Sequence, residues 1–197
     1  MIYINGTEYT YQPNQPIEVY THAPYAVCAL VNNAVYPLDT VPKDGVTIQL
    51  LTVNSRGGFF CYRQTLLLMF LTAVRGVFGK TRCTVRHSIG KTTYCEVDLP
   101  PALRPGADRK ILSYMQKLHE KNCPITRKAC TPQEAEAIFM QEGDIASADA
   151  MRCIGREHVN LYQIEDGYFH FSGALATNTG CIGKFDLKKH KNGFLLG

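Results

Sequence analysis

His87 is the residue of this chain whose type and neighbours come closest to catalytic chemistry. Ser88, Lys91 and Glu96 follow it closely in the sequence. In a polar pocket, this group could provide an acid, a base or ligand contacts, because imidazole exchanges protons near neutral pH. The alternative is a half-buried structural histidine, hydrogen-bonded across a pair of strands. We favour the alternative and predict no catalytic residue, because we identify neither a nucleophile at a suitable spacing nor a third member of a triad.

Lys184, Lys188 and Lys189 belong to the densest basic cluster of the sequence, near its C-terminal end. Such a cluster can contact the phosphates of RNA. It can also be a solvated edge strand, where lysine discourages pairing with another sheet. We favour the edge strand, because Phe185 alone provides too little aromatic surface for stacked bases. We therefore expect weak tRNA binding that changes little when these lysines are replaced.

Two Gly-Lys-Thr triplets, at 79–81 and 90–92, resemble the end of a phosphate-binding loop. Such a loop needs a glycine five residues before the Gly-Lys pair, after a strand and at the start of a helix. Val74 and Val85 occupy those positions. We therefore expect no cofactor and no phosphate transfer in this segment.

The eight cysteines are spread along the chain without a Cys-x-x-Cys pair. This distribution argues against a zinc ribbon or a thioredoxin-type site. Most of them lie in apolar runs, which is typical of reduced, buried thiols in a cytoplasmic protein. We predict no metal site.

The composition is that of a globular protein, with 45% hydrophobic and 19% charged residues among 197. A net charge of +4 is compatible with nucleic acid without arguing for it. The apolar run Leu66–Val74 is shorter than the roughly 20 residues that cross a bilayer. No signal-peptide pattern follows Met1. We expect a cytoplasmic protein with no membrane partner.

The elements that must position these residues centre on 61–98. The apolar residues of 66–77 predict a buried helix, and alternation over 83–88 and 93–97 predicts a hairpin that turns at Gly90. Further along, 131–134 is a capping box that opens a helix, and Asp108 is a candidate cap for the preceding helix. A third helix is expected over 147–153, and strands are expected at 159–164, 168–171, 181–187 and 193–196.

The first 53 residues read as a separate, mostly β module. Asn5-Gly6 marks a hairpin, 16–25 is a short irregular or helical connection, and 46–51 closes the sheet. This is a β-grasp pattern. The glycines of 54–60 indicate a flexible link, and 61–197 forms the second module. The predicted fold class is therefore α+β.

The segment ALVNNAVYPLDTVPKDGVTIQLL resembles the TGS domain at the front of threonyl-tRNA synthetases, some GTPases and nucleoside-kinase-like proteins. The second module resembles the SAD domain that threonyl- and alanyl-tRNA synthetases share, through its helix and hairpin and through TNTGCI…FDL at 177–187. The order of the two modules is more specific than either alone. The resemblance implies a β-grasp TGS domain over 1–53, followed by a SAD-like α+β domain over 61–197.

The hairpin VRHSI…YCEV resembles the corresponding part of bacterial uridine-kinase-like proteins, and FDL…GFLL resembles the point where those proteins enter their kinase domain. On this resemblance the chain is the non-catalytic regulatory or ligand-binding region of a nucleoside kinase. Its partner is then its own C-terminal kinase domain, which uses ATP and magnesium and would follow Gly197. The alternative is the tRNA-binding or editing region of a threonyl-tRNA synthetase. The ligand is then a small nucleotide or tRNA.

Editing domains of the SAD type carry His-x-x-x-His early in the first helix and Cys-x-x-x-His near the end. Aligned on that pattern, this chain has Gln64 and Leu68 at the early positions and Phe171 and Leu175 at the late ones. Three of the four are apolar. We therefore expect that the pocket has been refilled as core.

Overall fold

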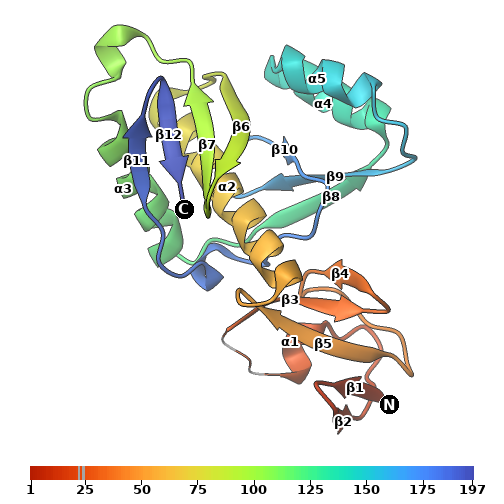
Figure 1. Cartoon of the computed structure of the whole chain (residues 1–197). Coiled ribbons are helices and arrows are strands. Elements are labelled where there is room, and N and C mark those ends of the chain that lie inside the picture. Colours follow the sequence, from red (N-terminus) through yellow and green to blue (C-terminus); the bar gives the residue numbers. More distant parts are fainter. Residues whose placement is uncertain (22, 24) are drawn as a thin grey trace.

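The computed structural model describes residues 1–21, 23 and 25–197, and its fold is α+β with three sheets. In Figure 1, a small sheet lies at the N-terminal end, and one long helix runs from it to the two other sheets. The predicted fold class is confirmed. The predicted connection over 16–25 contains a short helix, α1 (Ile17–Tyr20), while positions 22 and 24 lie outside the described residues.

The N-terminal sheet has the strand order β2-β1-β5-β3-β4. Its two central strands, β1 and β5, are parallel, and the other pairs are antiparallel. This is the β-grasp arrangement. Asn5 and Gly6 both have positive φ, as the predicted tight hairpin turn requires. The strands are β1 (Ile2–Ile4), β2 (Thr7–Tyr9), β3 (Ala26–Val31), β4 (Ala34–Tyr36) and β5 (Thr47–Thr52).

The central helix α2 (Arg56–Phe78) is longer than predicted, so the flexible link over 54–60 is wrong. Ser55 caps the helix by accepting a hydrogen bond from the backbone N–H of Gly58 at 3.1 Å. The glycine there allows a close approach: a Cβ on Gly58 would lie 2.0 Å from the Thr52 carbonyl oxygen. The absence of a side chain at Gly58 thus lets the first turn of α2 pack directly against the end of β5.

Length and composition alone would allow α2 to cross a membrane, but 56% of its most apolar window is buried inside the protein. Phe70, Met69 and Leu68 are fully enclosed. They belong to the largest hydrophobic cluster of the chain. Burial of this kind is typical of a core helix.

A four-stranded antiparallel sheet, in the order β11-β12-β7-β6, packs on α2 and α3 (Ala107–Glu120). Its other face carries no helix in Figure 1. The predicted hairpin is confirmed, with Gly90 and Lys91 as its turn. Asp108 does not cap α3, because Gly106 occupies that position. The strands are β6 (Cys83–Ile89), β7 (Thr92–Val97), β11 (Leu187–His190) and β12 (Gly193–Leu196), and a short 3-10 turn, η1 (Pro101–Leu103), follows β7.

A three-stranded sheet with two covering helices completes the fold. The predicted capping box is present: Thr131 and Glu134 bond each other's backbone N–H groups at the start of α4. The strand predicted over 181–187 is wrong, because that stretch is irregular after a 3-10 turn, η2 (Thr179–Cys181). The elements are β8 (Thr126–Cys130), β9 (Val159–Gln163), β10 (Phe169–His170), α4 (Pro132–Glu142) and α5 (Ile145–Arg152).

The β-grasp part and the rest of the chain share a buried cluster. Cys28 and Leu51 of the N-terminal sheet pack there against Cys61 of α2 and against Ala176. The Sγ of Cys61 also donates to the Val27 carbonyl at 3.5 Å. The division into domains at 53 and 61 stays a prediction.

All eight cysteines lie in the described part of the chain, and their thiols are free. Four of them are buried, at 28, 61, 95 and 130. Burial raises the pKa of Cys95 to about 12, so this thiol stays protonated at neutral pH.

Candidate functional site

The four positions aligned on the editing pattern lie where α2 meets the segment 171–176. The backbone N–H of Ala176 donates to the Thr65 hydroxyl at 2.9 Å, and the Thr65 hydroxyl donates to the Cys61 carbonyl. Both groups are buried. The structure therefore brings together the two segments that the alignment places in one site.

The side chains at these positions provide no metal ligand. Leu68 and Leu175 have no exposed surface, and Phe171 is 7% exposed. All three belong to the main hydrophobic cluster, and Gln64 is half-buried beside it. The aligned positions are therefore packed core and not an open cleft.

His170 and Cys153 are engaged or placed elsewhere. His170 bonds the Asn160 carbonyl through Nδ1 at 3.1 Å, and Cys153 is exposed at the end of α5. Within 1–21, 23 and 25–197, no group of three His, Cys, Asp or Glu side chains is placed to hold a metal ion.

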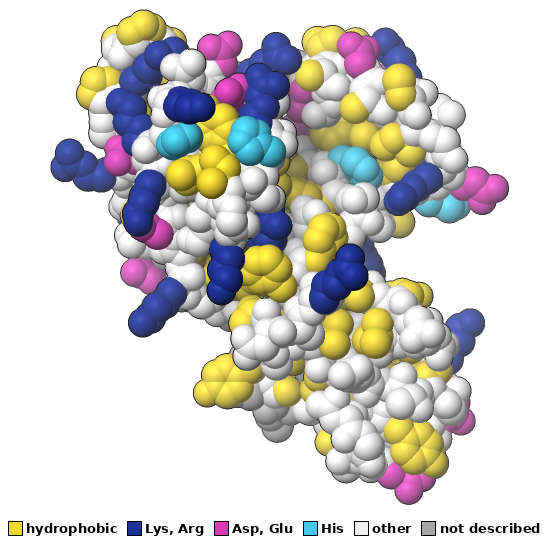
Figure 2. All heavy atoms as spheres, in the orientation of Figure 1, with side chains coloured by type: hydrophobic (Ala, Val, Ile, Leu, Met, Phe, Trp, Pro, Cys, Tyr) yellow, Lys and Arg dark blue, Asp and Glu magenta, His cyan; other side chains and the backbone are white. Residues whose placement is uncertain are grey.

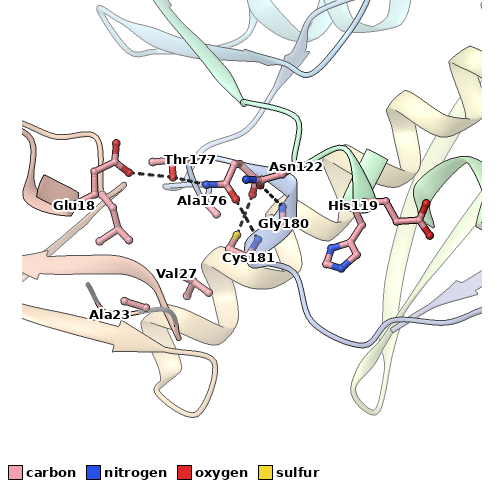
Figure 3. A pocket seen from close by; sticks show the side chains of 13 residues that line it. Glu18, Ala23, Val27, His119, Asn122, Ala176, Thr177, Gly180 and Cys181 are labelled. Atoms are coloured by element: carbon pink, nitrogen blue, oxygen red, sulfur yellow. Dashed lines mark hydrogen bonds between the residues drawn. The ribbon is translucent and has the colours of Figure 1, made fainter. Parts of the chain in front are cut away.

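A pocket of about 530 Å³ lies where the β-grasp part meets the rest of the chain. Figure 3 shows Glu18 on one side and His119 and Asn122 on the other, with Thr177 and Cys181 between them. The hydroxyl of Thr177 and the Glu18 carboxylate are joined by a hydrogen bond of 3.4 Å. Sequence analysis singled out 177–187 but not this pocket, because its other wall comes from the N-terminal part.

Cys181 is the thiol that lines this pocket. Burial raises its pKa to about 11, and its Sγ donates to the Asn178 carbonyl. A protonated thiol is a weak nucleophile. The pocket is therefore not suited to covalent catalysis by Cys181.

The predicted contact residues of the hairpin lie on two faces. A β-bulge between Val85 and Ser88 turns Arg86 and His87 to the open face of the sheet, beside Tyr94. Ser88 points the other way and accepts a hydrogen bond from Arg63 of α2 at 2.6 Å.

His87 is exposed, so the half-buried, hydrogen-bonded histidine that we favoured is wrong. A bulged edge strand leaves the imidazole in solvent. Glu96 lies on the same open face, where it pairs with Arg86 at 2.6 Å and accepts from the Tyr94 hydroxyl at 3.2 Å. Lys91 is exposed in the hairpin turn. The structure therefore brings His87 and Glu96 to one surface, and leaves Ser88 and Lys91 outside it.

Lys188 and Lys189 lie on β11, which is an edge strand of its sheet, and both are exposed. Lys184 is exposed in the irregular segment before this strand. A weak contact of 3.5 Å joins Lys188 to Asp186. These positions agree with an edge strand protected by lysine, and they also leave the three ammonium groups accessible.

No family model matches the chain. Threonine–tRNA ligase 1 of Bacillus subtilis (strain 168) is 26% identical over 148 residues, which are 75% of this chain and 23% of the relative. The threonine–tRNA ligase of Symbiobacterium thermophilum is 29% identical over 119 residues, 60% of this chain and 18% of the relative. That of Acidithiobacillus ferrooxidans (strain ATCC 53993 / BNL-5-31) is 23% identical over 173 residues, 87% of this chain and 27% of the relative.

These synthetases are homologues of the chain. The chain spans about a quarter of the length of the curated relatives that it matches. The synthetase part of the predicted resemblance is thereby confirmed. These relatives give no support for a uridine-kinase parent.

Proposed function

We propose that this chain is a tRNA-binding region of the threonyl-tRNA synthetase type that has lost the hydrolytic chemistry of an editing site. One observation carries the proposal. α2 is bonded to segment 171–176 through Thr65, and the positions aligned on the editing pattern hold the apolar side chains of Leu68, Phe171 and Leu175. A region in which these two segments still pack together, but which lacks metal-ligand side chains, can bind RNA without hydrolysing it.

The similarity to threonine–tRNA ligases supports tRNA as the partner in preference to a kinase domain. The charge distribution supports it as well. Lys and Arg side chains gather on the part of the chain after α2, whereas the β-grasp part shows few of them in Figure 2. Such a surface attracts a polyanion.

We expect the protein, purified without chelator, to contain less than stoichiometric zinc and to leave Ser-tRNA(Thr) intact. The physical reason is that leucine and phenylalanine neither bind a metal nor position water. Metal analysis and a deacylation assay measure the two quantities. Stoichiometric zinc, or hydrolysis that the variants His87→Ala or His170→Ala abolish, would contradict the loss of chemistry.

The sequence pattern alone predicts weak tRNA binding that changes little when the lysines are replaced, whereas a tRNA-binding region predicts the opposite. The affinity for tRNA should fall steeply as salt rises, because phosphate contacts release counterions. Lys188→Glu should weaken binding. It should also reduce the slope of the logarithm of the binding constant against the logarithm of the salt concentration by about 1. Lys43→Glu makes the same charge change on the β-grasp part, where Lys43 is exposed, and serves as the control. A filter-binding series in potassium chloride measures both. Equal losses in the two variants, or no binding at low salt, would refute the proposal.

A second candidate is a regulatory region attached to a nucleoside kinase, with ATP and magnesium bound by the kinase domain. The hairpin sequence from Val85 to Glu96 favours it. The gene sequence after the codon of Gly197 decides between the two. A strand followed by a phosphate-binding loop would support the kinase, and a class II synthetase core would exclude it. Cytoplasmic location stays a prediction.

A further inference from the structure

Positively charged side chains converge at the end of the four-stranded sheet where β6 begins and β7 ends. Arg82 precedes β6, Arg86 lies on it and Arg104 follows η1. These three line one pocket of about 330 Å³, which we call the arginine pocket. Lys189 and Lys191 line a smaller adjoining pocket that shares Arg104. In Figure 2, Lys and Arg side chains crowd over this end of the sheet, beside histidine side chains.

The arginine pocket has three guanidinium groups and two carboxylates, so its positive charge is only partly balanced. Glu96 and Asp98 are its two carboxylates. Arg86 occupies the first through their ion pair, and this guanidinium holds the pKa of Glu96 below its ordinary value. Arg82 and Arg104 have no ion-pair partner among the residues that the structure describes. Cations held close together repel one another, and a bound anion would remove that repulsion.

The donors of the pocket suit a phosphate group. Guanidinium groups bind phosphate through two parallel N–H bonds. The Nε of Arg104 donates to the Leu99 carbonyl at 3.0 Å, which positions this side chain at the pocket. Thr84 and Asn192 add a hydroxyl and an amide to the lining. The pocket therefore combines charge with neutral hydrogen-bond donors.

An aromatic group adjoins the pocket on the open face of the sheet. The Tyr94 ring lies between the rings of His87 and His190, with centroid separations of 5.6 and 5.5 Å. Its hydroxyl donates to Glu96, which itself lines the arginine pocket. Tyr94 is only 5% exposed, so the imidazoles are the rings that a ligand meets. Imidazole faces can stack on nucleobases.

We propose that the arginine pocket binds the phosphate monoester of a nucleotide, with the base against the imidazoles of His87 and His190. A monoester carries close to two negative charges at neutral pH. Arg82 and Arg104, with Lys189 and Lys191 of the adjoining pocket, outnumber the one carboxylate without an ion pair, Asp98. The pocket volume lies in the range of small-molecule sites. The inference goes beyond tRNA binding and does not depend on it.

Calorimetric titration of the whole chain with uridine 5′-monophosphate, ribose 5-phosphate and uridine, at low ionic strength, tests the proposal. We expect the nucleotide to bind more tightly than ribose 5-phosphate, and uridine not to bind. Arg82→Ala and Arg104→Ala should each weaken the nucleotide about tenfold, as expected for one charged hydrogen-bonding group. His87→Ala should weaken the nucleotide but leave ribose 5-phosphate unchanged, because only the base meets the ring.

Arg156→Ala is the matched control, since Arg156 is exposed in the loop after α5 and lines a different pocket. Circular dichroism checks the fold of each variant, and Arg104→Lys, which keeps the charge without the planar fork, covers the case in which alanine unfolds the chain. Uridine binding as tightly as its phosphate, equal losses with Arg156→Ala, or no saturable binding would overturn the proposal. Nucleotide binding without tRNA binding would support the arginine pocket as a nucleotide site and would refute the tRNA proposal.

Discussion

Replacing Gly58 with alanine is expected to lower the free energy of unfolding by about 3 kcal/mol, in the upper range for overpacking. The new Cβ would lie 2.0 Å from the carbonyl oxygen of Thr52 and 2.6 Å from its carbon. That oxygen cannot move freely, because it accepts hydrogen bonds from the backbone N–H and the hydroxyl of Ser55, at 3.0 and 2.8 Å. Either α2 or the end of β5 must shift, and the joint between the two parts of the chain is weakened.

Thermal unfolding followed by circular dichroism measures this effect. A loss of that size corresponds to a fall in Tm of about 6–12 °C for a chain of this length. Gly155→Ala is the control, because nothing lies within 4 Å of a Cβ at that position. A similar Tm for the two variants would show that the approach of α2 to Thr52 is looser than in the structure.

Leu68→Ala is expected to lower the free energy of unfolding by about 2–5 kcal/mol, as is usual for a large aliphatic side chain removed from a packed core. Leu68 has no exposed surface and packs in the same cluster as Phe171 and Leu175. The result bears on function. A residue that lines an open cleft can be truncated with little loss of stability, whereas one that refills a former site cannot.

Urea unfolding followed by circular dichroism suits this measurement, since the chain has no tryptophan. Leu67→Ala makes the same change one residue earlier, where the leucine is only partly buried, and should lose clearly less. A loss below about 1 kcal/mol for Leu68→Ala, in the range of surface substitutions, would mean that the aligned positions still border a cavity.

Local sequence signals predicted the elements whose causes are local. The capping box at Thr131 and Glu134 and the turn at Gly90 were predicted correctly, because side-chain and backbone bonds within a few residues determine them. The start of α2 was missed. Gly57 and Gly58 favour a flexible link in isolation, and only the close approach of Thr52 shows why glycine stands in the first turn of a helix.

The same division holds for the candidate sites. Aligned spacing placed Leu68, Phe171 and Leu175 at one site, and the structure packs them in one cluster. The half-buried environment expected for His87 was wrong, because a β-bulge is a local irregularity that alternation of residue types does not reveal.

By itself the sequence determined the class of the fold, since residue types and periodicity carry this information. The order of a TGS-like and a SAD-like part, and the loss of the editing side chains, are what its resemblance to synthetase domains implies. Only the tertiary structure decided which charged groups meet. Arg82 and Arg104 stand far apart in the sequence from Asn192, yet all three line one pocket. The physical reason is that β12 pairs with β7, whose other edge pairs with β6, so the C-terminal hairpin lies beside the end of β7. Such long-range contacts leave no short spacing in the sequence.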